Sequence, residues 1–176
     1  NVDNAGLASP FGGVGLGIDM TGGDLEELRV GDATLQNTNL NDNASHGFVL
    51  NMAGGSTSVT NPTQLLNLQA NGNGGNGSAV VMSGAAQISD LVVTGSTFNE
   101  NDGNGFLVST TGTAVLTTAS FQDVTANDND IDGIQFLREG GSTMAATAPN
   151  AITLDNVNAN LNTGNGLSIT AGNLDA

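Results

Sequence analysis

The chain repeats a short polar motif, N-x-N-x-x-x-G, at nearly even intervals along its length. The five clear copies have glycines separated by 30, 28, 28 and 33 residues, and a degenerate copy at Gly15 lies 32 residues before the first. An internal period of this length is typical of stacked repeat architectures, in which each repeat contacts its neighbours. The motif glycines are Gly47, Gly77, Gly105, Gly133 and Gly166.

Two asparagines precede each motif glycine at fixed distances. Those four residues before it are Asn43, Asn73, Asn101, Asn129 and Asn162. Those six residues before it are Asn41, Asn71, Asn99, Asn127 and Asn160. If repeats stack, each set becomes a column of amides that can bond one another and the backbone at a corner, where strand pairing does not satisfy them. We therefore predict two internal asparagine ladders, the first four residues and the second six residues before the glycine. Asparagine also tolerates the left-handed backbone that corners need.

Apolar residues keep the same register and recur two residues apart, which is the period of a strand with one buried face. The columns one and three residues after the glycine start at Leu16 and Ile18 and are apolar in every copy except at Ser78. Another inward column, twelve residues before the glycine, starts at Leu35. Five of the six phenylalanines fall on inward columns: Phe48, Phe98, Phe106, Phe121 and Phe136. We therefore predict that each repeat contains about three short strands. Successive repeats bury their apolar side chains by stacking, with equivalent strands paired in parallel about 4.8 Å apart.

Three segments carry a resemblance to a known family: LQNTNLNDNASHGFVL (35–50), STFNENDGNGFLV (96–108) and LDNVNANLNTGNGLSI (154–169). They resemble the repeats of right-handed parallel β-helix proteins of the pectate-lyase-like superfamily. The resemblance implies an all-β fold, a right-handed parallel β-helix (β-solenoid). The glycine spacing predicts about six coils with 28–33 residues per coil. We expect a single domain over residues 1–176, with a degenerate first coil at 1–29 and regular coils at 30–172.

Charge and composition exclude several classes of function. Two basic residues stand against seventeen acidic ones, for a net charge of −15, and the chain has no Cys and no Lys. Nucleic acid is not expected as a partner, because phosphate recognition depends on clusters of Lys and Arg. Disulfides and thiolate metal sites cannot form, and no apolar run approaches the roughly 20 residues of a membrane span. This composition favours an extracellular or cell-surface protein.

Both ends of the sequence continue the repeat pattern. Leu167 and Ile169 keep the strand pattern in the last repeat, and residues 2–5 (VDNA) resemble residues 154–157 (LDNV). An open solenoid end exposes apolar side chains and unpaired strand edges. We therefore expect the chain either to stack end to end into fibres or to be a segment of a longer solenoid.

An acidic stretch at residues 127–133, followed by Glu139, matches the calcium-loop pattern D-x-[DN]-x-[DN]-G-x5-E without the flanking helices of an EF-hand. One coil earlier, two acidic residues hold the same offsets from the glycine as Asp128 and Asp130. Stacking would bring these carboxylates to about 5 Å from one another, where like charges repel unless they hold a cation. The predicted calcium ligands are Glu100, Asp102, Asp128, Asp130 and Asp132.

The function expected from these features is a non-catalytic structural or adhesive module, such as a filament subunit or an adhesin, that associates with itself end to end. The alternative is a lyase-like or hydrolase-like β-helix that acts on or binds extracellular polysaccharide. The resemblance to pectate lyases implies a catalytic arginine near a carboxylate cluster, which offers Arg138 together with Asp128, Asp130 and Asp132. Against that alternative, the inward phenylalanines leave no aromatic platform for a sugar, and the acidic chain suits anionic polyuronates poorly. His46, the single histidine, is interpreted as a corner residue.

Overall fold

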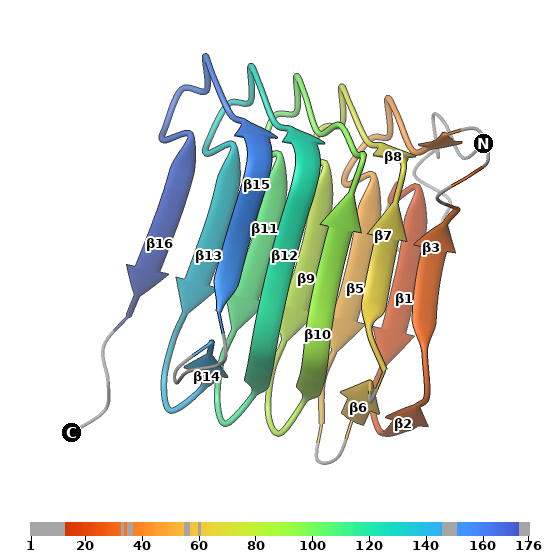
Figure 1. Ribbon diagram of the computed structural model, residues 1–176, viewed down its shortest axis with the longest axis vertical. Coiled ribbons are helices and arrows are strands. Elements are labelled where there is room, and N and C mark those ends of the chain that lie inside the picture. Colours follow the sequence, from red (N-terminus) through yellow and green to blue (C-terminus); the bar gives the residue numbers. More distant parts are fainter. Residues whose placement is uncertain are drawn as a thin grey trace.

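The structure is a computed structural model that describes residues 13–32, 34, 37–54, 57–59, 61–145 and 151–172. Leu35 and residues 2–5, on which two expectations rest, lie outside these described residues. All regular structure in the described part of the chain is β-strand, stacked into a parallel β-solenoid of about five turns (Figure 1). The estimate of about six coils counted one glycine per coil, whereas six copies of a strand enclose five full turns.

The first sheet is built from the strand that follows each motif glycine. Its neighbours pair in parallel and in register, so Leu16 lies beside Phe48, and Phe48 lies beside Ser78. From one end to the other, its strands are β1 (Leu16–Met20), β5 (Phe48–Met52), β9 (Ser78–Met82), β11 (Phe106–Thr110), β13 (Ile134–Arg138) and β16 (Leu167–Ala171).

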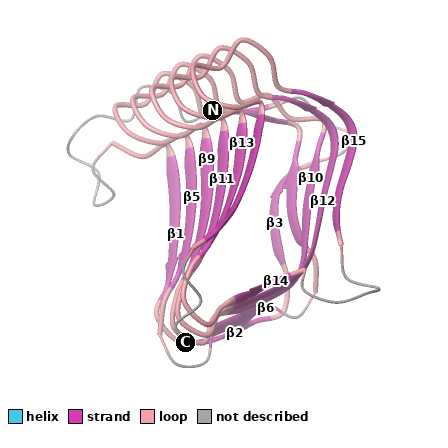
Figure 2. Cartoon of the chain, turned by 90° about the vertical axis from the view of Figure 1, so that its left-hand side faces the viewer, coloured by secondary structure: helices cyan, strands magenta, loops and turns pink. Residues whose placement is uncertain are grey.

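The second sheet bends around the rest of each coil (Figure 2). Short strands form its lower corner: β2 (Gly23–Leu25), β6 (Thr57–Val59) and β14 (Thr143–Met144). Its flank, which faces the first sheet, contains β3 (Leu28–Gly31), β7 (Thr63–Leu66) and β15 (Ile152–Asn158). Two long strands run through both regions, β10 (Gln87–Thr94) and β12 (Val115–Thr125). The two-residue strands β4 (Thr38–Asn39) and β8 (Leu68–Gln69) pair beside the motif loops that close the top of each coil.

The coil is right-handed, as the resemblance implied. In Figure 1 the chain descends along the first sheet at the back and rises along β3, β7, β10, β12 and β15 at the front, while successive coils advance from right to left. This is the sense that parallel crossover connections overwhelmingly adopt. In the described part of the chain, no helix has the length and apolar character required to cross a membrane.

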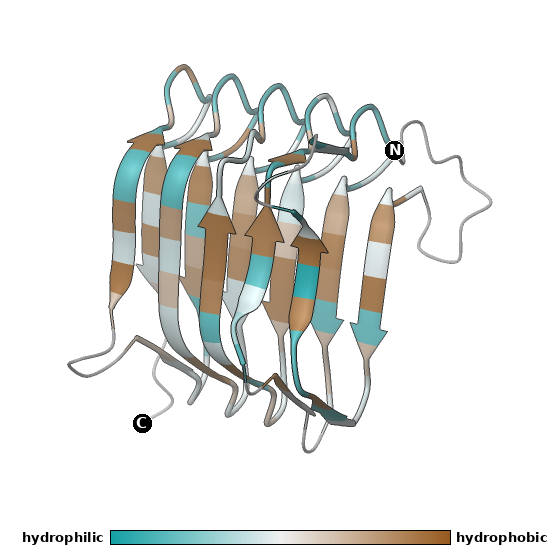
Figure 3. Ribbon diagram, turned by 45° about the vertical axis from the view of Figure 1, so that its right-hand side comes forward, coloured by the Kyte–Doolittle hydropathy of each residue, from teal (hydrophilic) through white to brown (hydrophobic). Residues whose placement is uncertain are grey.

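The predicted inward columns form a continuous core between the two sheets. Along the strands, apolar residues alternate with polar ones (Figure 3), and all five inward phenylalanines are fully buried. Four of their rings contact edge to face, with centroids 5.1 Å apart for Phe98 and Phe106, 5.0 Å for Phe106 and Phe121, and 5.6 Å for Phe121 and Phe136. Such pairs add about 0.5–1.5 kcal/mol each to the free energy of burial.

The left-handed residue at each motif corner lies between the two asparagines. None of the ten motif asparagines is among the residues with positive φ. The residues with positive φ are Asp42 (54°), Gly72 (65°), Glu100 (57°), Asp128 (56°) and Leu161 (58°). This column tolerates several residue types, because its side chains point away from the core and need only accept the left-handed backbone.

Ser78 is the one polar residue on its otherwise apolar column, and its hydroxyl group is buried without a hydrogen-bond partner among the described residues. Its side chain is fully buried, and its Oγ has no hydrogen-bond partner within the described part of the chain. Ser96 is equally buried, yet its Oγ accepts from the Leu68 amide at 3.1 Å and donates to the Thr94 carbonyl at 2.9 Å. The two serines therefore differ in the satisfaction of their hydroxyl groups.

We predict that Ser78→Ala raises the free energy of unfolding by about 1 kcal/mol, because it removes a buried hydroxyl without a partner. Ser96→Ala is the matched control and is expected to lower it by about 1–3 kcal/mol, since the Leu68 amide loses its acceptor. Denaturant unfolding of both variants measures the difference. Similar losses of stability in the two variants would contradict the assignment.

Candidate functional site

The first ladder runs unbroken through the interior of the motif corners. From the second asparagine of the ladder, Asn73, to the last, Asn162, each Oδ1 atom accepts from both the backbone N–H and the Nδ2 group of the asparagine one coil earlier. For Asn101 these bonds come from Asn73 at 3.0 and 2.9 Å, and Asn101 in turn donates to Asn129 at 3.1 and 2.9 Å. Asn101 is 1 % exposed. This ladder therefore satisfies polar groups that solvent cannot reach.

The second ladder points the opposite way and lies nearer the surface. Here the Oδ1 atom accepts from the backbone N–H of the following coil, as from Asn99 to Asn71 at 2.7 Å and from Asn127 to Asn99 at 2.8 Å. Asn71, Asn99 and Asn127 are half-buried and Asn160 is exposed. The first column therefore lies in the interior of the solenoid, whereas the second lies between the core and the solvent.

A third ladder, which the sequence analysis missed, occupies the position immediately before the motif glycine. Asn104 donates its backbone N–H to Oδ1 of Asn76 at 2.7 Å, and Asp132 donates its backbone N–H to Oδ1 of Asn104 at 3.0 Å. Asn165 then donates both its backbone N–H and its Nδ2 group to Oδ1 of Asp132, at 2.6 and 3.1 Å. The column was hidden because Asp132 and His46 interrupt a run of asparagines. The recurring Asn-Gly pair was the available signal.

His46 begins the third ladder. Its Nδ1 accepts the backbone N–H of Asn76 at 2.7 Å, which requires a neutral imidazole with a free lone pair on Nδ1. Burial lowers the pKa of His46 below its ordinary value of 6.5. The histidine therefore serves as a stacking residue of the corner and performs the same task as asparagine in the later coils.

The predicted calcium ligands do not form one site. The register sets Glu100 beside Asp128, and Asp102 beside Asp130, with all four exposed at the motif corner. Asp132 is separate: it is 5 % exposed, and its Oδ2 accepts from Nε2 of Gln135 at 3.2 Å while Oδ1 serves the third ladder. Within the described ranges, no group of three or more His, Asp or Glu side chains is arranged to hold a metal ion.

The prediction placed Asp132 wrongly because the two-residue alternation of inward and outward side chains changes at the corner. Continued alternation would leave Asp132 in solvent with Asp128 and Asp130. Instead Ile131 is 47 % exposed, and Asp132 turns inward. The two-residue period of a strand does not hold through an irregular turn.

Arg138 is remote from these carboxylates. It ends β13 on an inward column beside Thr110, is half-buried, and donates from Nε to the carbonyl of Ser142 at 2.6 Å. Asp128, Asp130 and Asp132 precede the opposite end of β13, and a five-residue strand spans about 13 Å between its end residues. The structure therefore does not bring the arginine and the carboxylates of the carbohydrate alternative together.

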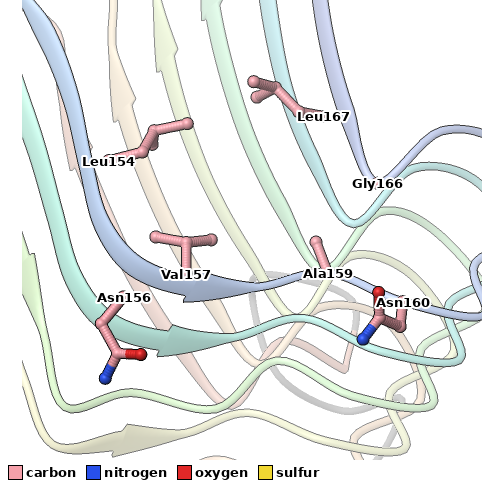
Figure 4. A pocket seen from close by; sticks show the side chains of 7 residues that line it. All are labelled: Leu154, Asn156, Val157, Ala159, Asn160, Gly166 and Leu167. Carbon is pink, nitrogen blue, oxygen red and sulfur yellow. The ribbon is translucent and has the colours of Figure 1, made fainter.

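The last described coil presents an open apolar end, here called the C-terminal face and formed by Leu154, Val157, Ala159, Leu167 and Ile169. Leu167 is 42 % and Ile169 63 % exposed, whereas their counterparts one coil earlier, Ile134 and Phe136, are fully buried. Within the described residues, β16 pairs with β13 and β15 with β12, so each has one unpaired edge. Figure 4 shows Leu154, Val157, Ala159 and Leu167 around the hollow at this end, with Asn156, Asn160 and Gly166 along its rim.

Comparison with known proteins returns no matching family, no matching curated protein and no matching solved structure. The parallel β-solenoid fold therefore rests on the strand pairing itself. The C-terminal face is the candidate functional surface, because it combines exposed core residues with free strand edges.

We predict that Asn101→Ala lowers the free energy of unfolding by about 2–4 kcal/mol, because it leaves the backbone N–H and Nδ2 of buried Asn73 without their acceptor. Oδ1 of Asn129 loses one of its two donors and keeps the backbone N–H of residue 101. Asn99→Ala, two residues away in the second ladder, is expected to cost about 1 kcal/mol, since water can reach the amide that it frees. Chemical denaturation of both variants provides the comparison. Equal losses of unfolding free energy in the two variants would contradict the larger contribution assigned to the buried first ladder.

We predict that the stability of the protein decreases as the pH falls below 6.5 towards the lowered pKa of folded His46. The sign follows from linkage: the unfolded chain takes up the proton first, so folding loses stability below the unfolded pKa and keeps it fully above. His46→Asn, which installs the residue of the equivalent positions, should abolish this component. Thermal melting from neutral to mildly acidic pH measures it, and identical profiles for the two proteins would exclude a contribution of His46.

Proposed function

We propose that this chain is a non-catalytic structural or adhesive β-solenoid module, extracellular or at the cell surface, that associates with itself end to end. The observation that carries this proposal is the C-terminal face. Its residues occupy columns that are buried in the interior coils, so the face has the chemistry of a coil-to-coil interface that no further coil covers among the described residues. Burial of Leu167 and Ile169 would contribute about 1–2 kcal/mol each.

The partner proposed for this face is the first coil of a second copy. Contacts between adjacent coils already join equivalent columns throughout the chain, and Leu16 and Ile18 lie on the same columns as Leu167 and Ile169. The cross-section is asymmetric, with motif loops at the top and short strands at the lower corner (Figure 2). In a head-to-tail arrangement the motif loops and short strands of one copy lie over the same features of the next copy. When two like ends meet, these features no longer coincide.

Charge supports the same arrangement. The first described coil, residues 13–32, carries Asp19, Asp24, Glu26, Glu27 and Asp32 against Arg29, whereas residues 151–172 carry a single acidic residue, Asp155. Two acidic first coils would repel each other, while an acidic end and a nearly neutral end would not. The overall charge of −15 still opposes association, so we expect salt to strengthen it.

The location outside the cell is proposed from composition, because the chain has no Cys and no Lys and carries a strongly acidic surface. Membership of the pectate-lyase-like superfamily is proposed from the repeat pattern. A role as a carbohydrate-active enzyme is less well supported, since Arg138 and the acidic residues lie at opposite ends of β13.

The experiment is sedimentation velocity of the purified chain over a range of protein and salt concentrations, with electron microscopy of the most associated sample. The expected result is a concentration-dependent series of linear oligomers that grows with salt. Ile169→Glu should abolish it, because the variant places a charge on the C-terminal face.

Ser168→Glu is the matched control, since it adds the same charge to the same strand on the opposite, outward side. Association should persist in this variant. A chain that stays monomeric at every salt concentration, or that responds equally to the two substitutions, would refute the proposal.

A further inference from the structure

Five asparagines of the chain are followed by glycine, which is the pair most prone to spontaneous deamidation. In that reaction the backbone nitrogen of the following residue attacks the asparagine side-chain carbon Cγ, and a glycine offers no Cβ to hinder the approach. The pairs are Asn71–Gly72, Asn73–Gly74, Asn76–Gly77, Asn104–Gly105 and Asn165–Gly166.

In four of these pairs, stacking occupies the attacking nitrogen. The glycine N–H groups donate to carbonyl oxygens of an adjacent coil: Gly72 to Asn99 at 3.0 Å, Gly74 to Asn43 at 2.9 Å, Gly77 to Asn104 at 2.9 Å and Gly105 to Asp132 at 3.0 Å. A nitrogen held in this way must break its hydrogen bond before it can turn toward Cγ. Each internal pair is therefore protected by its neighbouring coil.

The fifth pair lacks this protection. Every earlier motif glycine from Gly15 to Gly133 donates its N–H to the following coil, but within the described residues the N–H of Gly166 has no acceptor. Its acceptor would belong to the next coil along the axis.

The side chain of Asn165 is also less restrained than its counterparts. It is exposed, whereas Oδ1 of Asn76 is held by the N–H of Asn104, and Oδ1 of Asn104 by the N–H of Asp132. Within the described residues, Oδ1 of Asn165 accepts no such bond, so its carbonyl group is accessible to the Gly166 nitrogen.

We propose that Asn165 is a site of selective, non-enzymatic deamidation in the folded protein. The Gly166 nitrogen loses its proton and forms a bond to Cγ of Asn165, the Cγ–Nδ2 bond breaks, and the side-chain nitrogen leaves as ammonia with that proton. Water then opens the resulting succinimide at either carbonyl and yields aspartate or isoaspartate. The reaction needs no reagent other than water, and it does not depend on the proposed function.

The product changes the end of the solenoid. Nδ2 of Asn165 donates to Oδ1 of Asp132 at 3.1 Å, so deamidation replaces a hydrogen bond by two neighbouring carboxylates, which repel each other. The isoaspartate product also lengthens the main chain immediately before β16. Both products therefore weaken the attachment of the last coil, and the site acts as a timer for the loosening of the C-terminal face.

The test is incubation of the full chain in mildly alkaline buffer, at a concentration at which size-exclusion chromatography shows it to be monomeric, followed by peptide mapping with mass spectrometry. We expect Asn165 to deamidate about tenfold faster than Asn76 and Asn104, because the competing sites must first break a backbone hydrogen bond. In denaturant the three rates should become similar. The same rate at all three positions in the folded monomer would overturn the proposal.

Two variants complete the experiment. Asn165→Gln should remove the fast mass change, because the six-membered ring that glutamine would have to form closes slowly. Asn165→Asp should lower the melting temperature, and the added substitution Asp132→Asn should recover part of the loss by removing the like charge. An Asn165→Asp variant as stable as the parent would overturn the timer role, independently of whether copies stack end to end.

Discussion

Parallel, in-register stacking of the coils is the constraint on which the rest of this structure depends. Stacked strands satisfy their own backbone groups, but each irregular corner repeats the same set of unpaired donors and acceptors in every coil. Three ladders solve that problem, two running toward one end of the solenoid and one toward the other. The acidic loops and the apolar core are arranged around them.

The sequence was informative wherever one residue type repeats in a column. The asparagine and glycine columns predicted the solenoid and its register, and the apolar alternation predicted the burial of Phe98, Phe106 and Phe136. A column can keep its hydrogen-bonding role while its residue type changes, as at His46 and Asp132 in the third ladder. Such a column cannot be recognised from residue type alone.

The wrong placement of Asp132 has its physical origin in the geometry of the corner. Alternation was continued from the strands into residues 127–133, where Ile131 faces solvent and Asp132 does not. At the same corners the left-handed conformation belongs to the residue between the two asparagines. Because corner geometry depends on φ values that many polar residues tolerate, residue type alone does not fix which side chain points inward.

The edge-to-face contacts of four phenylalanines concentrate cohesion in the middle and later turns. In a solenoid each coil contacts its two neighbours, so opening proceeds from the ends rather than all at once. Amide hydrogens near Phe106 and Phe121 should therefore exchange with solvent last, whereas those of β16 exchange early. In such a molecule the terminal coils can unfold and refold reversibly, because the folded coils around the phenylalanines still offer strand edges on which they can pair again.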